Sequence, residues 1–105
     1  MSKMTDVKIH GWVQINNDFE QMLICAERYA IGRQSYLPPD TIAYIRFLIP
    51  QLSSNTLYII ATDIAEEFRR YARIDREMPY GKEWAELSKI VIVEYNKKKA
   101  VQDAT

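Results

Sequence analysis

The chain has 105 residues, the size of a single domain with one core. Its fourteen basic and fourteen acidic residues give a formal net charge of zero, which argues against a sequence-independent nucleic-acid binder, because such proteins usually carry a basic excess. The single cysteine excludes an internal disulfide, and no apolar run is long enough for a signal sequence or a membrane span. We therefore expect a soluble, cytoplasmic protein.

Residues 1–16 show no clear helical period. The run "VKIHGWVQI" alternates loosely, but Gly11 interrupts it and no second clear strand is available to pair with it. We expect an irregular N-terminal arm over 1–16, a helical domain over 17–100 and a frayed tail over 101–105.

The first helix is predicted to begin after Asn17, a suitable N-cap, and acidic residues follow at its start. Gly32 is expected to end it, because glycine accepts the left-handed conformation of a helix C-cap. Spacings of three and four residues define the predicted core face: Phe19, Met22, Leu23, Ala26 and Ala30.

Two more helices are predicted after the proline pair at 38–39, which suits a first helical turn. Pro50 is expected to kink or end the second helix, and the third is expected from about Asn55 to about Arg76. Their apolar positions recur at helical spacing: Ile42, Ile45, Leu48, Ile49 and Leu52 in the second helix, and Leu57, Ile60, Ala61, Ile64, Phe68 and Tyr71 in the third.

A fourth helix is predicted from about Lys82, with an apolar face of Trp84, Leu87, Val91 and Tyr95. Its run "KIVIVEY" favours a strand by propensity, but the helical segments around it favour a helix. Four helices joined by short loops indicate an all-α fold, a compact four-helix bundle with an irregular N-terminal arm. Several apolar residues fall outside the predicted core faces, which suggests self-association: Ile24, Tyr58, Ile59, Ile90, Ile92 and Val93.

Catalytic and metal-binding constellations are not evident in the sequence. Cys25 would need a base, and His10, the only histidine, lies in the arm, so we expect Cys25 to be an inert core residue. These two residues cannot make a tetrahedral zinc site by themselves. Asp63, Glu66 and Glu67 are expected to form a solvated acidic face. We expect no enzyme activity, no metal and no cofactor.

Four side chains form the main candidate binding stretch: Arg28, Tyr29, Arg33 and Tyr36. In one interpretation the two arginines are structural clamps, which hold the last carbonyls of the first helix or pair with a carboxylate such as Asp63 or Glu67 on a neighbouring helix. In the other, the four side chains present a ligand-binding surface, since guanidinium groups hold phosphate and tyrosines stack on bases.

Arg69, Arg73 and Arg76 lie along one stripe at the end of the third helix. Positive charge there is stabilised by the helix dipole by about 0.3–1 kcal/mol, which is a sufficient structural explanation. Glu66 can also pair with Arg69. If the protein binds a nucleotide, Arg69 and Arg73 are the members of this stripe that we expect to contribute.

The segment "CAERYAIGRQSY", Cys25–Tyr36, resembles a Cys-Ala-x-Arg-Tyr-Ala-x-Gly-Arg-x-(Ser/Thr)-Tyr signature of small proteins from bacteriophages and prophages, often of Gram-positive hosts. The later runs "LSSNTLYIIATDIAEEF" and "YGKEWAELSKI" are similar to other segments of the same proteins, so the resemblance spans about residues 18–90. It implies a mobile-element accessory protein and assigns no catalytic residue.

These observations lead to one main hypothesis, a non-enzymatic phage-type protein that binds and inhibits a host defence component, as a homo-oligomer in the host cytoplasm. The first alternative is an oligomeric sponge that sequesters a nucleotide signalling molecule. The second is a weak transcriptional or packaging accessory factor. The expected partner is thus a host defence protein or a nucleotide signal, whereas binding to nucleic acid or membrane is not expected.

Overall fold

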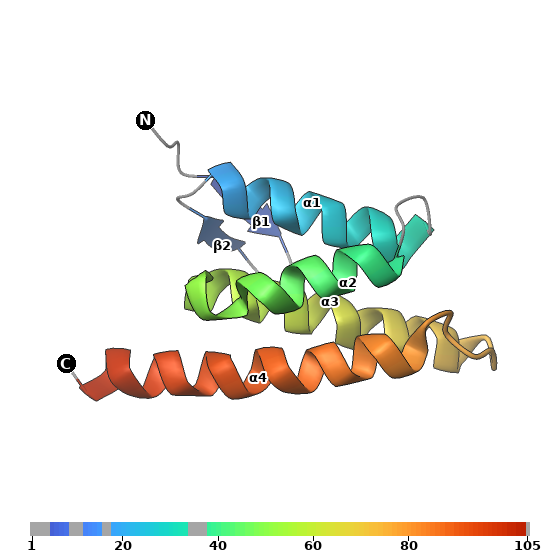
Figure 1. The fold of residues 1–105 in the computed structure, drawn as a ribbon. Helices are drawn as coiled ribbons and strands as arrows, with labels where there is room; N and C mark the ends of the chain where they lie inside the picture. The colour runs from blue at the N-terminus through green and yellow to red at the C-terminus, as the bar shows by residue number, and fades with distance from the viewer. Residues whose placement is uncertain (1–4, 9–11, 16–17, 34–37, 105) are drawn as a thin grey trace.

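A computed structural model of the protein describes residues 5–8, 12–15, 18–33 and 38–104 (Figure 1). The elements follow in chain order: β1 (Thr5–Lys8), β2 (Trp12–Ile15), α1 (Asp18–Arg33), α2 (Pro38–Leu48), the 3-10 helix η1 (Ile49–Gln51), α3 (Ser54–Arg73) and α4 (Gly81–Ala104). The predicted all-α four-helix bundle is confirmed.

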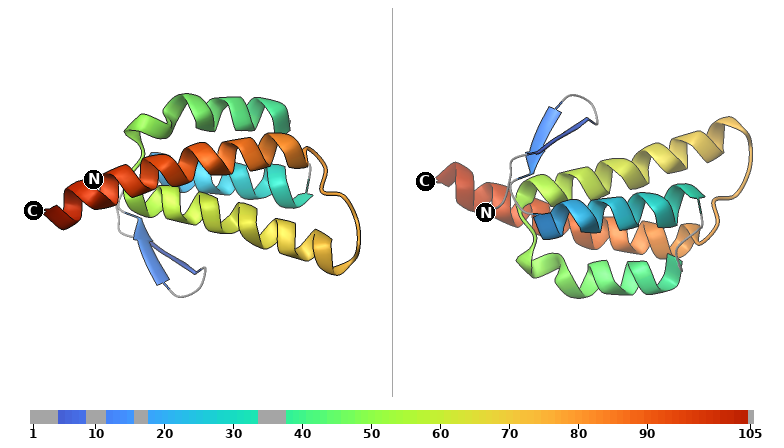
Figure 2. Two further views of the ribbon diagram at one scale, coloured as in Figure 1. Left: turned by 90° about the horizontal axis from the view of Figure 1, so that it is seen from below. Right: turned by 90° about the horizontal axis from the view of Figure 1, so that it is seen from above.

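The four helices occupy the corners of a four-sided bundle. α1 lies against α2 and α3, and α4 lies against the same two helices. In both views of Figure 2, α2 and α3 flank the bundle on opposite sides, with α1 and α4 between them, one in front of the other. The α1–α2 side and the α3–α4 side are therefore opposite sides of the bundle.

Neighbouring helices α1 and α3 run in the same direction. Glu20 of α1 lies beside Ser53 at the start of α3, and Arg28 lies beside Asp63 farther along both helices. Because α2 and α3 are diagonal to one another, the segment that joins them crosses the end of the bundle.

A side chain of α4 holds this crossing segment in place. The Lys98 ammonium donates to the carbonyl of Pro50 at 2.9 Å and also to the carbonyl of Leu52. Both carbonyls lie at or just after η1, where helical hydrogen bonding stops, so the ammonium supplies donors that the helix no longer provides. The prediction for Pro50 is confirmed, since α2 ends at Leu48.

The start of α3 is capped from two sides. Ser53 is the N-cap, and its hydroxyl accepts the backbone N–H of Thr56 at 3.3 Å. The backbone N–H of Ser53 in turn donates to the Glu20 carboxylate of α1 at 2.7 Å. The helix thus begins at Ser54, close to the predicted Asn55.

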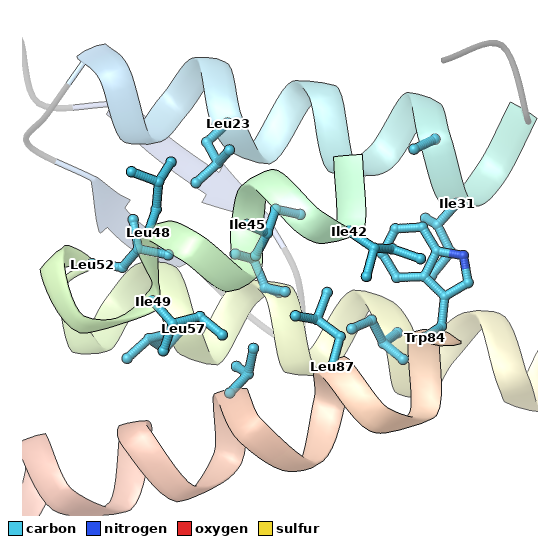
Figure 3. Close-up of a cluster of buried hydrophobic side chains, with 14 of the residues drawn as sticks. Leu23, Ile31, Ile42, Ile45, Leu48, Ile49, Leu52, Leu57, Trp84 and Leu87 are labelled. Atoms are coloured by element: carbon cyan, nitrogen blue, oxygen red, sulfur yellow. The ribbon is translucent and has the colours of Figure 1, made fainter. Parts of the chain in front are cut away.

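Apolar side chains from all four helices fill the centre of the bundle (Figure 3). Trp84 is fully buried and belongs to the same core cluster as Ile31 and Ile42. The predicted core positions of the second helix are all buried, as are these positions of α3 and α4: Leu57, Ile60, Ile64, Trp84, Leu87 and Val91. The helical prediction for "KIVIVEY" is confirmed, because α4 runs through it.

The predicted core face of α1 is partly wrong. Leu23 and Ala30 are buried, but Phe19 and Met22 are exposed. The interior instead receives four residues that the prediction left out: Glu20, Ile24, Glu27 and Ile31. The cause is that α1 packs against both α2 and α3. Its buried face is therefore centred closer to α3 than the predicted stripe that contains Phe19 and Met22.

The N-terminal arm has more regular structure than predicted. β1 and β2 pair in antiparallel register, with Val7 opposite Val13, so the partner for each strand lies within the arm itself. β2 lies against α3 and α1, the helices that carry the fully buried Ile24 and Ile59. Some of the apolar residues that lie outside the predicted core faces are therefore covered within one chain. Self-association stays a prediction.

The C-terminal segment is helical through Ala104, beyond the point where we expect fraying. The Lys98 hydrogen bonds attach this segment to the crossing segment, and the Ser54 hydroxyl donates to the side-chain carbonyl of Gln102 at 3.3 Å.

The ends of α1 and α3 differ from the predicted ends, Gly32 and Arg76. Gly32 lies inside the last turn of α1 and does not adopt a left-handed conformation. α3 ends at Arg73, before the predicted Arg76, and the residue in the left-handed region is Asp75, with φ of 53°. The backbone N–H of Arg76 then donates to the Tyr71 carbonyl at 3.1 Å, which satisfies one of the last carbonyls of the helix.

Candidate functional site

Arg28 links α1 to α3 through a two-point contact. Its Nε donates to Oδ2 of Asp63 at 2.8 Å, and its Nη2 donates to Oδ1 at 3.3 Å. Burial by itself would lower the pKa of Arg28, but the hydrogen bond and the charge of Asp63 outweigh it and raise the pKa. Of the two roles considered for Arg28, a structural clamp and a ligand-binding residue, the structure shows the clamp, an ion pair that joins α1 to α3.

Glu27 is fully buried next to this ion pair. Its carboxyl oxygens accept no hydrogen bond from the residues that the structure describes, but the protonated carboxyl is within hydrogen-bonding reach of the Asp63 carboxylate. Burial, followed by the negative charge of Asp63, raises the pKa of Glu27 well above its ordinary value, although Arg28 opposes the shift. Glu27 thus keeps its proton to a higher pH than an exposed glutamate. We call Glu27, Arg28 and Asp63 the α1–α3 polar cluster.

The acidic residues of α3 are only partly the solvated face that the spacing predicts. The side chain of Asp63 is only 16% exposed, because α1 covers it. Glu67 pairs with Arg70, and the more exposed Glu66 pairs with Arg69. Within the described ranges no group of three or more histidine, cysteine or acidic side chains is arranged to hold a metal ion.

The structure separates the members of the predicted binding stretch. Arg28 points toward α3, whereas Tyr29 is exposed on the outer side of α1, because consecutive helical residues point about 100° apart. The side chain of Arg33 and all of Tyr36 lie outside the described residues. The two members that can be placed do not form one surface.

The predicted arginines of α3 lie in two different settings. Arg69 pairs with Glu66 and borders a recess between α3 and α4. Arg73 is exposed in the last turn of α3, where its charge suits the helix dipole.

Cys25 is exposed, so the prediction that it is a core residue is wrong. It lies on the outer side of α1 with Met22 and Tyr29, one turn before and after it. The neighbouring Ile24 faces the interior instead. Apolar neighbours in the sequence therefore did not indicate which of the two adjacent residues is buried.

The main feature that the sequence did not reveal is an apolar face on α1 and α2. Met22 is 71% exposed and Phe47 is 75% exposed, although such large side chains usually gain stability from burial. We call the following five exposed residues the α1–α2 apolar face: Phe19, Met22, Tyr29, Tyr44 and Phe47. The spacing of Phe19 and Met22 indicates an apolar stripe, but spacing alone does not separate a core stripe from a surface stripe.

Two hollows lie along this face. The first, of about 410 Å³, lies between α1 and α2: its described lining is Phe19, Met22, Leu23, Ala26, Asp40, Thr41 and Tyr44. The second, of about 480 Å³, has this described lining: Asp18, Gln21, Met22, Cys25, Ala26 and Tyr29. Each hollow contains one aspartate, and neither has a basic residue in its described lining. The arrangement can bind an apolar segment that carries positive charge nearby.

Comparisons with known proteins find no matching family model, no similar curated protein and no similar solved structure. Among the helices that the structure describes, none combines the length and the hydropathy needed to cross a membrane.

Proposed function

We propose that the protein is a non-enzymatic binding protein that engages another protein through the α1–α2 apolar face. The observation that carries the proposal is the exposure of large apolar side chains on α1 and α2, with Phe19, Met22 and Tyr44 around one hollow between the two helices. Tyrosine, phenylalanine and methionine are enriched at protein interfaces, and an exposed apolar patch is typical of an interaction site. A bundle of this size gains no stability from leaving them exposed.

The chemistry of the face favours an amphipathic helix as the bound segment. A groove between two helices accepts apolar side chains from one face of a third helix. Asp40 and Asp18 place negative charge at the two hollows, so lysine or arginine beside the apolar anchors would complement them. Two copies of this face would instead bring these carboxylates together, which disfavours self-association through it.

The resemblance to phage proteins makes a host defence component the first partner to test, with inhibition by occupation of its surface. This step of the proposal rests on the residues of the Cys25–Tyr36 signature. The apolar face supplies a means of binding that requires no catalytic group.

The proposal can be tested with a photo-crosslinking residue placed at position 22 or, as a control, at Lys89, which is exposed on α4. Each tagged variant is expressed in host cells and irradiated. We expect one host protein to crosslink from position 22 and not from position 89. The substitution Phe47→Asp should abolish its co-purification without changing the melting temperature, because Phe47 is mostly in solvent.

Equal crosslinking from both positions, or retention of the partner by Phe47→Asp, would contradict the assignment of the face. Crosslinking only between copies of the protein would show that the occupant is a second copy.

A further inference from the structure

A recess lies between α3 and α4, on the side of the bundle opposite the α1–α2 apolar face. Its volume is about 290 Å³. We call it the α3–α4 recess, and its described lining is Tyr58, Ala61, Thr62, Ala65, Arg69, Ile92, Tyr95 and Asn96. The proposed function does not use this side of the molecule.

Small side chains on α3 create the recess. Ala61 and Ala65 lie one helical turn apart on the same face, where larger residues would fill the space against Ile92 of α4. On the inner faces of the same two helices, large side chains such as Leu57 and Trp84 are buried in the core. The recess is one of the hollows along this pair of helices, and another, of about 560 Å³, lies where the end of α3 meets the start of α4.

Two tyrosine rings border one part of the recess. The ring centroids of Tyr58 and Tyr95 are 6.0 Å apart and the rings are inclined by 42°. The separation lies within the range of aromatic contact pairs, and both rings border the recess. Both tyrosines are only partly buried, so a ligand can reach them. Stacking on such rings is the usual way in which proteins hold nucleobases.

A positive charge borders the recess farther along α3. Arg69 follows Tyr58 by eleven positions, which is roughly 16 Å along a helix. Helical side chains lean toward the N-terminus, and the ion pair of Arg69 with Glu66, one turn earlier, agrees with that direction. The guanidinium therefore lies nearer the Tyr58 end of the recess than its own Cα does, and both residues border the same recess.

The ion pair with Glu66 leaves Arg69 able to bind an anion. Both side chains are substantially exposed, 61% and 44%, and such pairs contribute little to stability. A guanidinium has five N–H donors, so it can contact a phosphate while it retains Glu66. Asn96 adds an amide that can both donate to and accept from the edge of a base.

We infer that the α3–α4 recess binds a mononucleotide-class ligand, with its planar ring against Tyr58 and Tyr95 and its phosphate at Arg69. The volume is close to the lower limit of ligand pockets, about 300 Å³, so it suits one ring system and not a whole dinucleotide. This site shares only Arg69 with the residues that the sequence suggested for a nucleotide signal. It is independent of the α1–α2 apolar face.

The inference is tested by titrating the isotope-labelled protein with AMP, GMP, CMP and UMP while recording amide NMR spectra. Ribose 5-phosphate and inorganic phosphate serve as controls. We expect at least one nucleotide to shift signals from residues 58–69 and 92–96, and neither control to do so at the same concentration. Absence of shifts with all four nucleotides at several millimolar, or shifts confined to α1 and α2, would overturn the inference.

Three variants identify the binding residues. Ala65→Leu fills the recess and should abolish binding, while circular dichroism reports whether the helices are retained. Arg69→Gln should weaken binding by about tenfold, the effect of losing one charged contact. Arg70→Gln is the control, because Arg70 also pairs with the glutamate three positions earlier, Glu67, but does not line the recess.

Unchanged binding by a folded Ala65→Leu protein, or equal losses for the two arginine variants, would overturn the inference. If Ala65→Leu fails to fold, the comparison of Arg69→Gln with Arg70→Gln decides, since both side chains are exposed.

Discussion

Helices α1 and α3 lie side by side and run in the same direction, yet they divide their residues between core and solvent in different ways. α3 buries apolar residues such as Leu57 and Ile60 and directs most of its charged residues outward. α1 buries two glutamates, Glu20 and Glu27, and exposes Phe19 and Met22. The distribution of buried and exposed residues on α3 is therefore the one that selection for fold stability alone would produce. The distribution on α1 is not.

This difference indicates that a functional site is to be sought on α1. Departures from the pattern that stabilises a fold are expected at functional sites. α1 shows two of them, the α1–α3 polar cluster on its inner side and the α1–α2 apolar face on its outer side. The first has a structural role through Arg28 and Asp63, whereas the second has none that the described residues supply.

The largest effect should come from truncating the core face of α3. Ile60→Ala should lower the free energy of unfolding by about 2–5 kcal/mol, because Ile60 is fully buried, whereas Met22→Ala should cost less than about 0.5 kcal/mol. Urea denaturation of both variants measures the difference. Similar costs for the two would mean that Met22 is not a surface residue.

A smaller loss is expected from breaking the clamp. Arg28→Ala should cost about 1–2 kcal/mol, between the values for exposed and fully buried ion pairs, because Asp63 is mostly buried and would be left beside Glu27. Arg46→Ala, which removes an exposed arginine of α2, is the control and should have little effect. Equal costs in urea denaturation would show that the ion pair with Asp63 contributes nothing.

The third effect depends on pH. The raised pKa of Glu27 means that folding favours its protonated form, so the wild-type protein loses stability as pH rises from about 4.3 through the folded-state pKa. Glu27→Gln cannot ionise. Its stability relative to wild type should therefore increase with pH across this window and stay level below it. Thermal unfolding between pH 4 and pH 8 measures this, with the same substitution at the exposed Glu86, Glu86→Gln, as the surface control.

The smallest effects should appear at the helix ends. Gly32→Ala should stabilise the protein by about 0.5 kcal/mol, because the position is helical and an added Cβ would meet no described atom within 4 Å. Asp75→Gly should also stabilise by about 0.5 kcal/mol, because Asp75 holds a left-handed conformation that glycine accepts without steric cost. Thermal unfolding of each variant gives the sign, and destabilisation by Gly32→Ala would show that this glycine is needed after all.

Prediction from sequence was most successful where the signal is local. The prolines at 38–39 and 50 mark a helix start and a helix end, and the apolar spacing of α2, α3 and α4 identifies residues that are buried. It was least successful for α1, where Cys25 and Phe19 were assigned to the core and are exposed. The α1–α2 apolar face was missed because Phe19 and Met22 were assigned to the core.

The sequence by itself determined the number of helices, their approximate ends and the inner faces of three of them, because caps, prolines and periodic apolar residues act within a few positions of one another. Only the tertiary structure decided which face of α1 is covered, which carboxylate receives Arg28 and how the α2–α3 segment crosses the bundle. Periodicity shows which residues share a helix face, but not which neighbour lies against it. Glu20 with Ser53 and Arg28 with Asp63 are 33 and 35 positions apart, and only the packing of whole helices brings them together.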